Sequence, residues 1–336
     1  MWKSWYLNGI MHLMQPRKVD ISHRTIIFIA VFILGLWLIY IIRDLLLILF
    51  ISLILMSALS PIVNLFTKFK LPKALGIAIT YIIIIAIVSG LFAIVLPPLI
   101  EESRRLIITL PPLLEQVFNV TGIDKSILQS QLTSLSQNVF SVTLAVFDNL
   151  LTIVFLLVLT FYLLLERNNV EERFAALFVS RRERVKKLIV QIEEKLGGWL
   201  RGQLFLSFLI GVLSYIGLML LGIPYALPLA VVAGVMEVVP VIGPIISAIP
   251  SILVGLTISP ILALGVGAMY IVIQQFENHL IVPQVMKRAV GLNPLVVILA
   301  IAVGSRILGF AGALLAVPIA VVIQIIVSEI IEGKKI

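Results

Sequence analysis

Long, uninterrupted runs of hydrophobic residues dominate the chain. Three of them lie in the first hundred residues, at 26–42, 45–59 and 74–96, and further runs follow to the C-terminus. A run of roughly 18 or more apolar residues predicts a membrane-spanning helix, because backbone polar groups in lipid must be paired within their own segment. The hydrophobicity is continuous rather than alternating, which excludes a porin-type barrel. The pattern therefore predicts an all-α polytopic membrane protein.

Composition supports this prediction. Hydrophobic residues make up 61% of the chain and charged residues only 12%, whereas a soluble domain has about a quarter of its residues charged. The chain has no cysteine, so disulfides, Cys-based zinc sites and thiol catalysis are excluded. The polar, basic first 25 residues precede a run of full span length without a small-residue cleavage pattern, which does not match a cleaved signal peptide.

Basic residues cluster between alternate spans. They gather in the N-terminal segment, around Lys68 and Lys70, through 167–201 and near both Lys287 and Lys334. Because basic loops stay on the cytoplasmic side, this placement predicts that both termini of the chain lie inside. The same placement explains the net charge of +8 without nucleic acid as a partner.

The spans and charges together predict the order of segments. The segment rich in basic residues at 168–198 carries an apolar stripe at helical spacing, which fits either a helix on the membrane surface or a packed cytoplasmic helix pair. We expect a cytoplasmic segment at 1–25, three spans within 26–97, an external segment at 98–140, a fourth span at 141–166, a cytoplasmic amphipathic segment at 167–200 and a transport core at 201–336.

Two segments near the C-terminus, 222–258 and 291–327, cannot each cross the membrane once. About 33 helical residues reach roughly 50 Å, against a hydrocarbon core of ~30 Å, and the flanking charges require an even number of crossings. Proline and glycine break the helical pattern where each segment should bend. Each segment is therefore predicted to be a helical hairpin, and the pair resembles an inverted repeat. The breaking residues are Pro240, Gly243, Pro244 and Pro250 in the first segment, and Gly304, Gly309, Gly312 and Pro318 in the second.

Charged and amide side chains within these apolar segments are the candidate site. Glu237 and Arg306 lie at corresponding depths in the two hairpins, and a charge inside a span is by default a functional hypothesis. They could form a structural ion pair, or Glu237 could bind a cation or proton while Arg306 binds a polar or anionic substrate group. Gln274, Glu277 and Asn278 share one helix face, either pointing into the bundle or marking a helix end at the interface.

Other chemistries find little support in the sequence. No His, Asp and Glu grouping has metal-site spacing, no phosphate-binding loop occurs, and no nucleophile–base arrangement can be defended. We expect neither an enzyme nor a cofactor.

At these motifs the chain resembles the autoinducer-2 exporter family of predicted permeases. The stretch from Glu237 to Pro250 follows the family's Pro-x-x-Gly-(six residues)-Pro pattern, and the other matching stretches begin at Glu277, Gly291 and Gly309. The resemblance implies an inner-membrane transporter of about eight membrane segments that forms oligomers, with pentamers seen in the family. It carries family motif positions onto Glu237, Pro240, Gly243, Pro244, Pro250, Glu277, Asn278, Pro283 and Pro318, whereas Arg306 comes from this sequence alone.

The sequence thus predicts a secondary transporter that exports a small polar solute such as autoinducer-2 across the membrane, with H⁺ or Na⁺ on Glu237 or Glu277. Substrate hydroxyls would hydrogen-bond to Gln274, Asn278 and the freed hairpin carbonyls. A Na⁺/H⁺ antiporter is the alternative within transport, and a non-transporting membrane scaffold or sensor is the alternative outside it.

Overall fold

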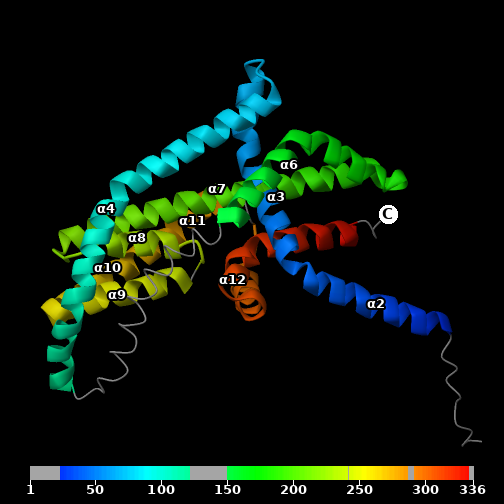
Figure 1. Cartoon of the computed structure of the whole chain (residues 1–336). Helices are drawn as coiled ribbons and strands as arrows, with labels where there is room; N and C mark the ends of the chain where they lie inside the picture. The colour runs from blue at the N-terminus through cyan, green and yellow to red at the C-terminus, as the bar shows by residue number, and fades with distance from the viewer. Residues whose placement is uncertain (1–22, 122–149, 241, 287–290, 333–336) are drawn as a thin grey trace, which may run out of the picture. The chain divides into compact units, whose positions relative to one another are not determined.

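The computed structural model describes residues 23–121, 150–240, 242–286 and 291–332, and all regular elements in these ranges are helical (Figure 1). Short helices η2 (Val179–Arg181), η3 (Glu277–Ile281) and α11 (Val282–Met286) join longer ones. The longer helices are α2 (His23–Ile41), α3 (Arg43–Lys68), α4 (Lys73–Thr121), α6 (Leu150–Ala176), α7 (Arg182–Leu220), α8 (Ala226–Met236), α9 (Ile242–Ile258), α10 (Pro260–Phe276) and α12 (Pro294–Glu332).

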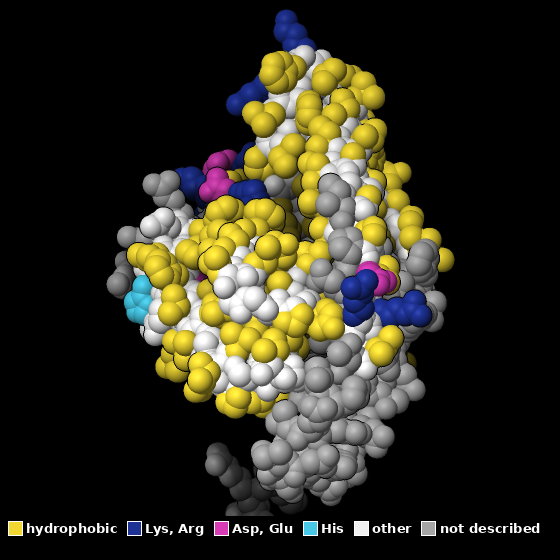
Figure 2. Space-filling model, turned by 90° about the vertical axis from the view of Figure 1, so that its left-hand side faces the viewer, with side chains coloured by type: hydrophobic (Ala, Val, Ile, Leu, Met, Phe, Trp, Pro, Cys, Tyr) yellow, Lys and Arg dark blue, Asp and Glu magenta, His cyan; other side chains and the backbone are white. Residues whose placement is uncertain are grey.

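Seven stretches of the described helices are long and apolar enough to span a membrane. Two shorter apolar helices, α8 and α9, accompany them. The face shown in Figure 2 is covered largely by hydrophobic side chains, and the charged ones form a few small groups. Helix α2, taken by itself, has no buried side chain, as expected of a helix that faces lipid. These features confirm the prediction of an all-α polytopic membrane protein.

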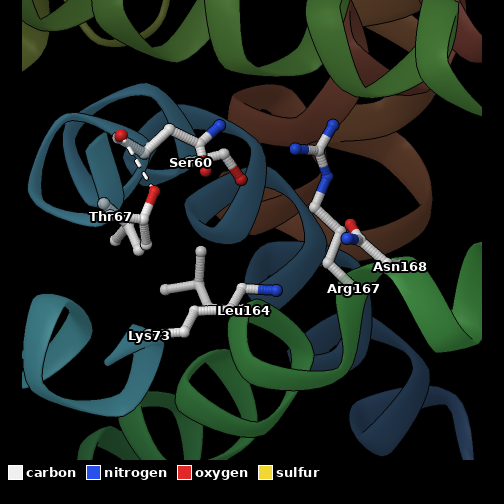
Figure 3. A pocket seen from close by; sticks show the side chains of 8 residues that line it. Ser60, Thr67, Lys73, Leu164, Arg167 and Asn168 are labelled. Atoms are coloured by element: carbon white, nitrogen blue, oxygen red, sulfur yellow. Dashed lines mark hydrogen bonds between the residues drawn. The ribbon is translucent and has the colours of Figure 1, made fainter. Parts of the chain in front are cut away.

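Helices α3, α4 and α6 pack around a small apolar cluster formed by Met56, Val63, Ile77 and Leu164. The Tyr81 hydroxyl of α4 donates a hydrogen bond to the Leu157 carbonyl of α6 at 2.9 Å. At the end of this packing, where α3 ends and α4 begins, polar side chains surround a cavity of about 250 Å³ (Figure 3).

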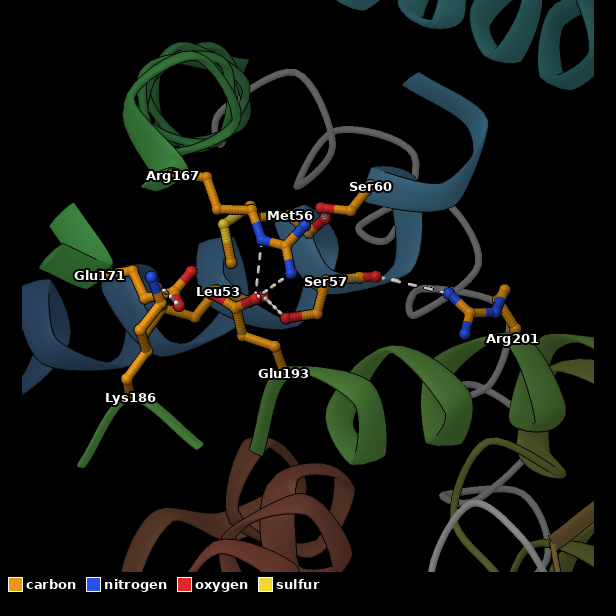
Figure 4. Close-up of polar contacts among 9 residues, drawn as sticks. All are labelled: Leu53, Met56, Ser57, Ser60, Arg167, Glu171, Lys186, Glu193 and Arg201. Atoms are coloured by element: carbon orange, nitrogen blue, oxygen red, sulfur yellow. Dashed lines mark hydrogen bonds and ion pairs between the residues drawn. The ribbon is translucent and has the colours of Figure 1, made fainter. Parts of the chain in front are cut away.

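Helices α6 and α7 form a pair joined by ion pairs (Figure 4). Arg167 of α6 donates from Nε to Glu193 of α7 at 2.7 Å, and Lys186 lies 3.7 Å from Glu172. The structure therefore divides the expected segment 167–200 between the end of α6 and the start of α7, as in the helix-pair alternative.

Two helices are longer than the sequence pattern suggested. Helix α7 continues to Leu220 without a break at residue 201, and α4 continues beyond residue 97 to Thr121. The polar side chains of Arg201 and Gln203 leave the helical backbone hydrogen bonds intact and so do not end α7, whereas α4 continues through Pro97 and Pro98. Parts of the expected external segment 98–140 and fourth span 141–166 lie outside the described residues.

The first predicted hairpin consists of α8, a turn at 237–240 and α9. Helices α7, α8, α9 and α10 share a core that includes Leu218, Leu229, Val254 and Val266. Close approach of α7 to α8 depends on glycine, because a Cβ on Gly234 would lie 2.8 Å from the Ser207 carbonyl oxygen. The break predicted around Pro240 is thus confirmed.

The second predicted hairpin lies within α12. Leu308 and Gly309 have non-helical backbone angles, and Gly309 has φ 61° and ψ −138°. The two arms fold against each other so closely that a Cβ on Gly304 would lie 2.3 Å from the Gly312 carbonyl oxygen. The break predicted at the glycines is therefore confirmed as well (Figure 1).

The two hairpins meet at one residue of the first turn. Val239 is 5% exposed and packs with Ile301 of the first arm of α12 and with Ala313 and Ala316 of the second. The bend of the first hairpin therefore contacts both arms of the second hairpin.

Candidate functional site

Glu237 lies at the bend of the first hairpin, directly after α8, and its side chain is 1% exposed in the described structure. Gln203 of α7 donates a hydrogen bond from Nε2 to the backbone carbonyl of Glu237 at 2.7 Å. Gln203 is itself buried. Broken backbone at membrane depth must be satisfied by protein groups, and Gln203 supplies the donor here.

Glu277 opens η3, a π-helical turn between α10 and α11. The turn precedes Pro283, which has no N–H to offer the carbonyl of His279 and whose ring crowds that carbonyl. The backbone widens instead, and the Val282 N–H bonds to the Glu277 carbonyl. π-turns are frequent at functional sites, and this one buries a carboxyl group.

The carboxyl groups of Glu237 and Glu277 are both buried and lie close enough to each other to interact. A hydrogen bond between two carboxyl groups requires that one of them carries a proton. Were both ionised, Oε2 of Glu237 would have no donor among the described residues, and two negative charges would share a buried site. A proton or another cation shared by the two carboxyl groups would remove this repulsion.

Two amide side chains, those of Gln274 and Asn278, lie beside the carboxyl pair. Gln274 of α10 donates from Nε2 to Glu277 Oε2 at 2.9 Å, and the same nitrogen lies 3.4 Å from Oδ1 of Asn278. Gln274 is half-buried and Asn278 is exposed. The polar path from the buried carboxyl pair therefore reaches the surface of the described structure through Gln274 and Asn278.

The remaining predicted residues are glycines and prolines within the two hairpins. Gly243 allows the first turn, because a Cβ there would lie 1.9 Å from the Met236 carbonyl oxygen. Pro240 and Pro244 flank it, while Pro250 lies within α9 and Pro318 within α12. Gly309 forms the second bend, and Gly312 lies in the second arm, where its backbone closely approaches that of Gly304.

Arg306 is separated from this group. It lies near the second bend, as predicted, but it is exposed, and Glu237 has Glu277 rather than Arg306 as its neighbour. The ion pair considered for Glu237 and Arg306 is absent from the described residues. The position of a residue along a hairpin indicates its depth in the membrane, but it does not determine which neighbouring helix its side chain faces.

Gln203 is the site residue that sequence analysis missed. It belongs to the run GGWLRGQLFLSF at the start of an apolar stretch. An amide within an apolar run, next to the small residue Gly202, was an available signal, because intramembrane polar residues face the bundle interior. The described residues contain no group of three or more His, Asp or Glu that could hold a metal ion.

Broken hairpins at membrane depth, a buried carboxyl pair and span-length helices define a polytopic membrane protein with the architecture typical of secondary transporters. Comparison with known proteins gives the particular group: the chain belongs to the AI-2E transporter family, whose model matches residues 26–332. It is a membrane-embedded transporter or permease of that family.

Characterised and uncharacterised relatives extend over most of the chain. The putative transport protein YueF of Bacillus subtilis is 27% identical over 82% of this chain and 81% of its own length. A putative transport protein of Mycobacterium tuberculosis is 30% identical over 80% of this chain and 78% of its own. The AI-2 transport protein TqsA of Escherichia coli is 26% identical over 83% and 84%.

Proposed function

We propose that this transporter exports a small polar solute of the autoinducer-2 kind across the inner membrane, with a cation carried by the Glu237–Glu277 pair. The observation that carries the proposal is the buried contact between these two carboxyl groups at the bend of a broken hairpin. A bound proton satisfies both groups, and its departure leaves a pair that must separate or bind another cation.

The solute is proposed from its chemistry and from a relative. Gln274 and Asn278 present amide groups that can donate to and accept from hydroxyls, and Asn278 is exposed at the end of the polar path. The relative TqsA is named an AI-2 transport protein, which supports a solute rich in hydroxyls.

Movement of the hairpin turn that carries Glu237 away from the π-turn that carries Glu277 would provide alternating access. Glu237 belongs to the hairpin turn, whereas Glu277 belongs to the π-turn after α10, so separating the two elements breaks the pair. In the proposed cycle, the outward-open state releases solute and binds a cation, and the inward-open state releases that cation and binds solute, so an inward cation gradient drives export. We propose that the protein works as a homo-oligomer, a pentamer by family resemblance, with both termini cytoplasmic and without nucleic acid.

A second candidate is exchange of Na⁺ for H⁺, which the carboxyl pair favours because carboxylates bind either cation. Transport assays in sealed proteoliposomes distinguish the two. We expect autoinducer-2 flux that responds to an imposed pH or Na⁺ gradient, and we expect Glu237→Gln and Glu277→Gln to abolish the response to the gradient. Glu183→Gln, which changes an exposed carboxylate on α7, should behave as the wild type.

Each other outcome contradicts a different part of the proposal. Proton movement on adding Na⁺, without flux of autoinducer-2, would support the exchanger instead. Unchanged gradient dependence in both glutamine variants would remove the carboxyl pair from the mechanism. A protein that moves neither solute nor ions would be a scaffold or sensor.

A further inference from the structure

The cavity where α3, α4 and α6 meet has no place in the proposed transport cycle. Its volume is about 250 Å³, equal to the share of liquid volume taken by about eight water molecules. The residues that line it come from the end of α3, the first residue of α4 and the middle of α6: Ser60, Val63, Asn64, Thr67, Lys73, Leu164, Arg167 and Asn168. The carboxyl pair lies on other elements, at the bend after α8 and at η3.

Lys73 is the cation of this cavity. Its Nζ donates one hydrogen bond, to the Leu165 carbonyl oxygen at 3.0 Å, and an ammonium has three donors. Arg167 is held differently, because Glu193 accepts from its Nε at 2.7 Å. Glu166, the acidic residue that influences Lys73 electrostatically, accepts a hydrogen bond from Asn169 at 2.6 Å, and Lys73 forms no ion pair with a described residue.

The other lining groups add donors rather than negative charge. The amides of Asn64 and Asn168 line the cavity from α3 and α6, and Figure 3 shows Thr67, Lys73 and Leu164 around the same space. No Asp or Glu lines it. A concave site with a cation and several amide and hydroxyl groups has the chemistry that recognises a phosphate oxygen.

The cavity lies beside the turn between α3 and α4, which carries Lys70 and directly follows Lys68 at the end of α3. This end is the one that the charge pattern predicts to be cytoplasmic, where anionic lipid headgroups are concentrated and basic pockets between helices bind them. We propose that the cavity binds a phosphate group through Lys73, Asn64 and Asn168. A phosphate can belong to a lipid headgroup or to a soluble anion, and experiment decides between these sources.

The test measures the thermal unfolding midpoint of the full chain in nanodiscs at constant ionic strength. One arm compares phosphatidylcholine discs with discs that contain phosphatidylglycerol, and the other adds inorganic phosphate to phosphatidylcholine discs. We expect the wild type to be stabilised in at least one arm. Stabilisation by phosphatidylglycerol alone identifies a lipid headgroup, and stabilisation by inorganic phosphate identifies a soluble anion.

Variants test the location. Lys73→Gln removes the cation and should weaken the apparent affinity for phosphate by about ten-fold or more. Asn168→Asp keeps the contact of Lys73 with Leu165 and places a carboxylate in the cavity, so it should abolish the shift even if Lys73→Gln folds poorly. Lys68→Gln, an exposed cation outside the cavity, is the matched control and should keep the wild-type shift. Equal shifts in all variants, or no shift in the wild type, would overturn the proposal.

Discussion

At the scale of single residues, the first hairpin depends on the absence of one side chain. Gly243 is buried, and its backbone N–H bonds to the Val239 carbonyl at 3.0 Å. An added Cβ would lie 1.9 Å from the Met236 carbonyl oxygen, which is backbone and cannot rotate away. The turn that presents Glu237 to Glu277 therefore requires glycine for space, not for an unusual backbone angle.

We expect Gly243→Ala to lower the free energy of unfolding by about 1–3 kcal/mol, the usual cost of forcing atoms into a packed site. The measurement is thermal or denaturant unfolding of the purified protein. Gly90→Ala is the control, because nothing lies within 4 Å of a Cβ at that helical position. That control should be neutral or stabilising by up to about 1 kcal/mol, since alanine favours helix over glycine. Equal effects of both substitutions would show that the close approach at Gly243 is unimportant.

At the scale of whole elements, a proline in α3 is compensated by an arginine in α7. Pro61 lies inside α3 and cannot donate to the carbonyl of Ser57, one turn earlier. Arg201 donates from Nη1 to the Ala58 carbonyl at 3.0 Å and lies 3.4 Å from the Ser57 carbonyl (Figure 4). Gly197 allows the approach, because a Cβ there would lie 2.4 Å from the Ser57 oxygen. The break in one helix thus becomes a contact between two.

This arrangement predicts a coupling between Pro61 and Arg201. Arg201→Ala should destabilise the protein by about 1–2 kcal/mol, because it leaves a carbonyl inside the bundle without its donor. Pro61→Ala restores an N–H for Ser57, so Arg201→Ala should cost less in that background. A double-mutant cycle of unfolding free energies measures the difference, which we expect to be about 1 kcal/mol. Additive effects would mean that Arg201 does not substitute for the missing donor.

At the scale of the whole molecule, orientation in the membrane remains a prediction from charge. The cavity near Lys73 and the helix pair of α6 and α7 belong to the side expected to be cytoplasmic, and the turn between α9 and α10 belongs to the other. The chain has no cysteine of its own, so a single introduced thiol reports its side without background.

We expect Lys68→Cys and Lys187→Cys to react with a membrane-impermeant maleimide only after the membrane is opened. Ile261→Cys, near the start of α10, should react from outside in intact cells. All three positions are exposed in the structure, so accessibility depends on side and not on burial. Labelling of Lys187→Cys in intact cells would show that the orientation is opposite to the predicted one. It would also place the proposed phosphate cavity at the outer face.

Much of the fold follows from local patterns. Apolar runs long enough to cross a bilayer gave the spans, and prolines and glycines located both hairpin bends, because a missing N–H or missing Cβ acts on its own segment whatever surrounds it. The continuity of α7 through Arg201 and Gln203 was not predictable in the same way. A polar residue signals both the end of a span and a buried contact, and only the neighbouring helix distinguishes them.

By itself the sequence determined that this is an α-helical membrane protein with broken helices, and it marked Glu237 and Glu277 as residues of interest. Only the tertiary structure decided that these two carboxyl groups contact each other, that Arg306 lies elsewhere, and that Gln203 supports the bend. The reason is physical: hydrophobicity and backbone breaks are properties of a segment, whereas the partner of a buried charge depends on how separate helices rotate and pack.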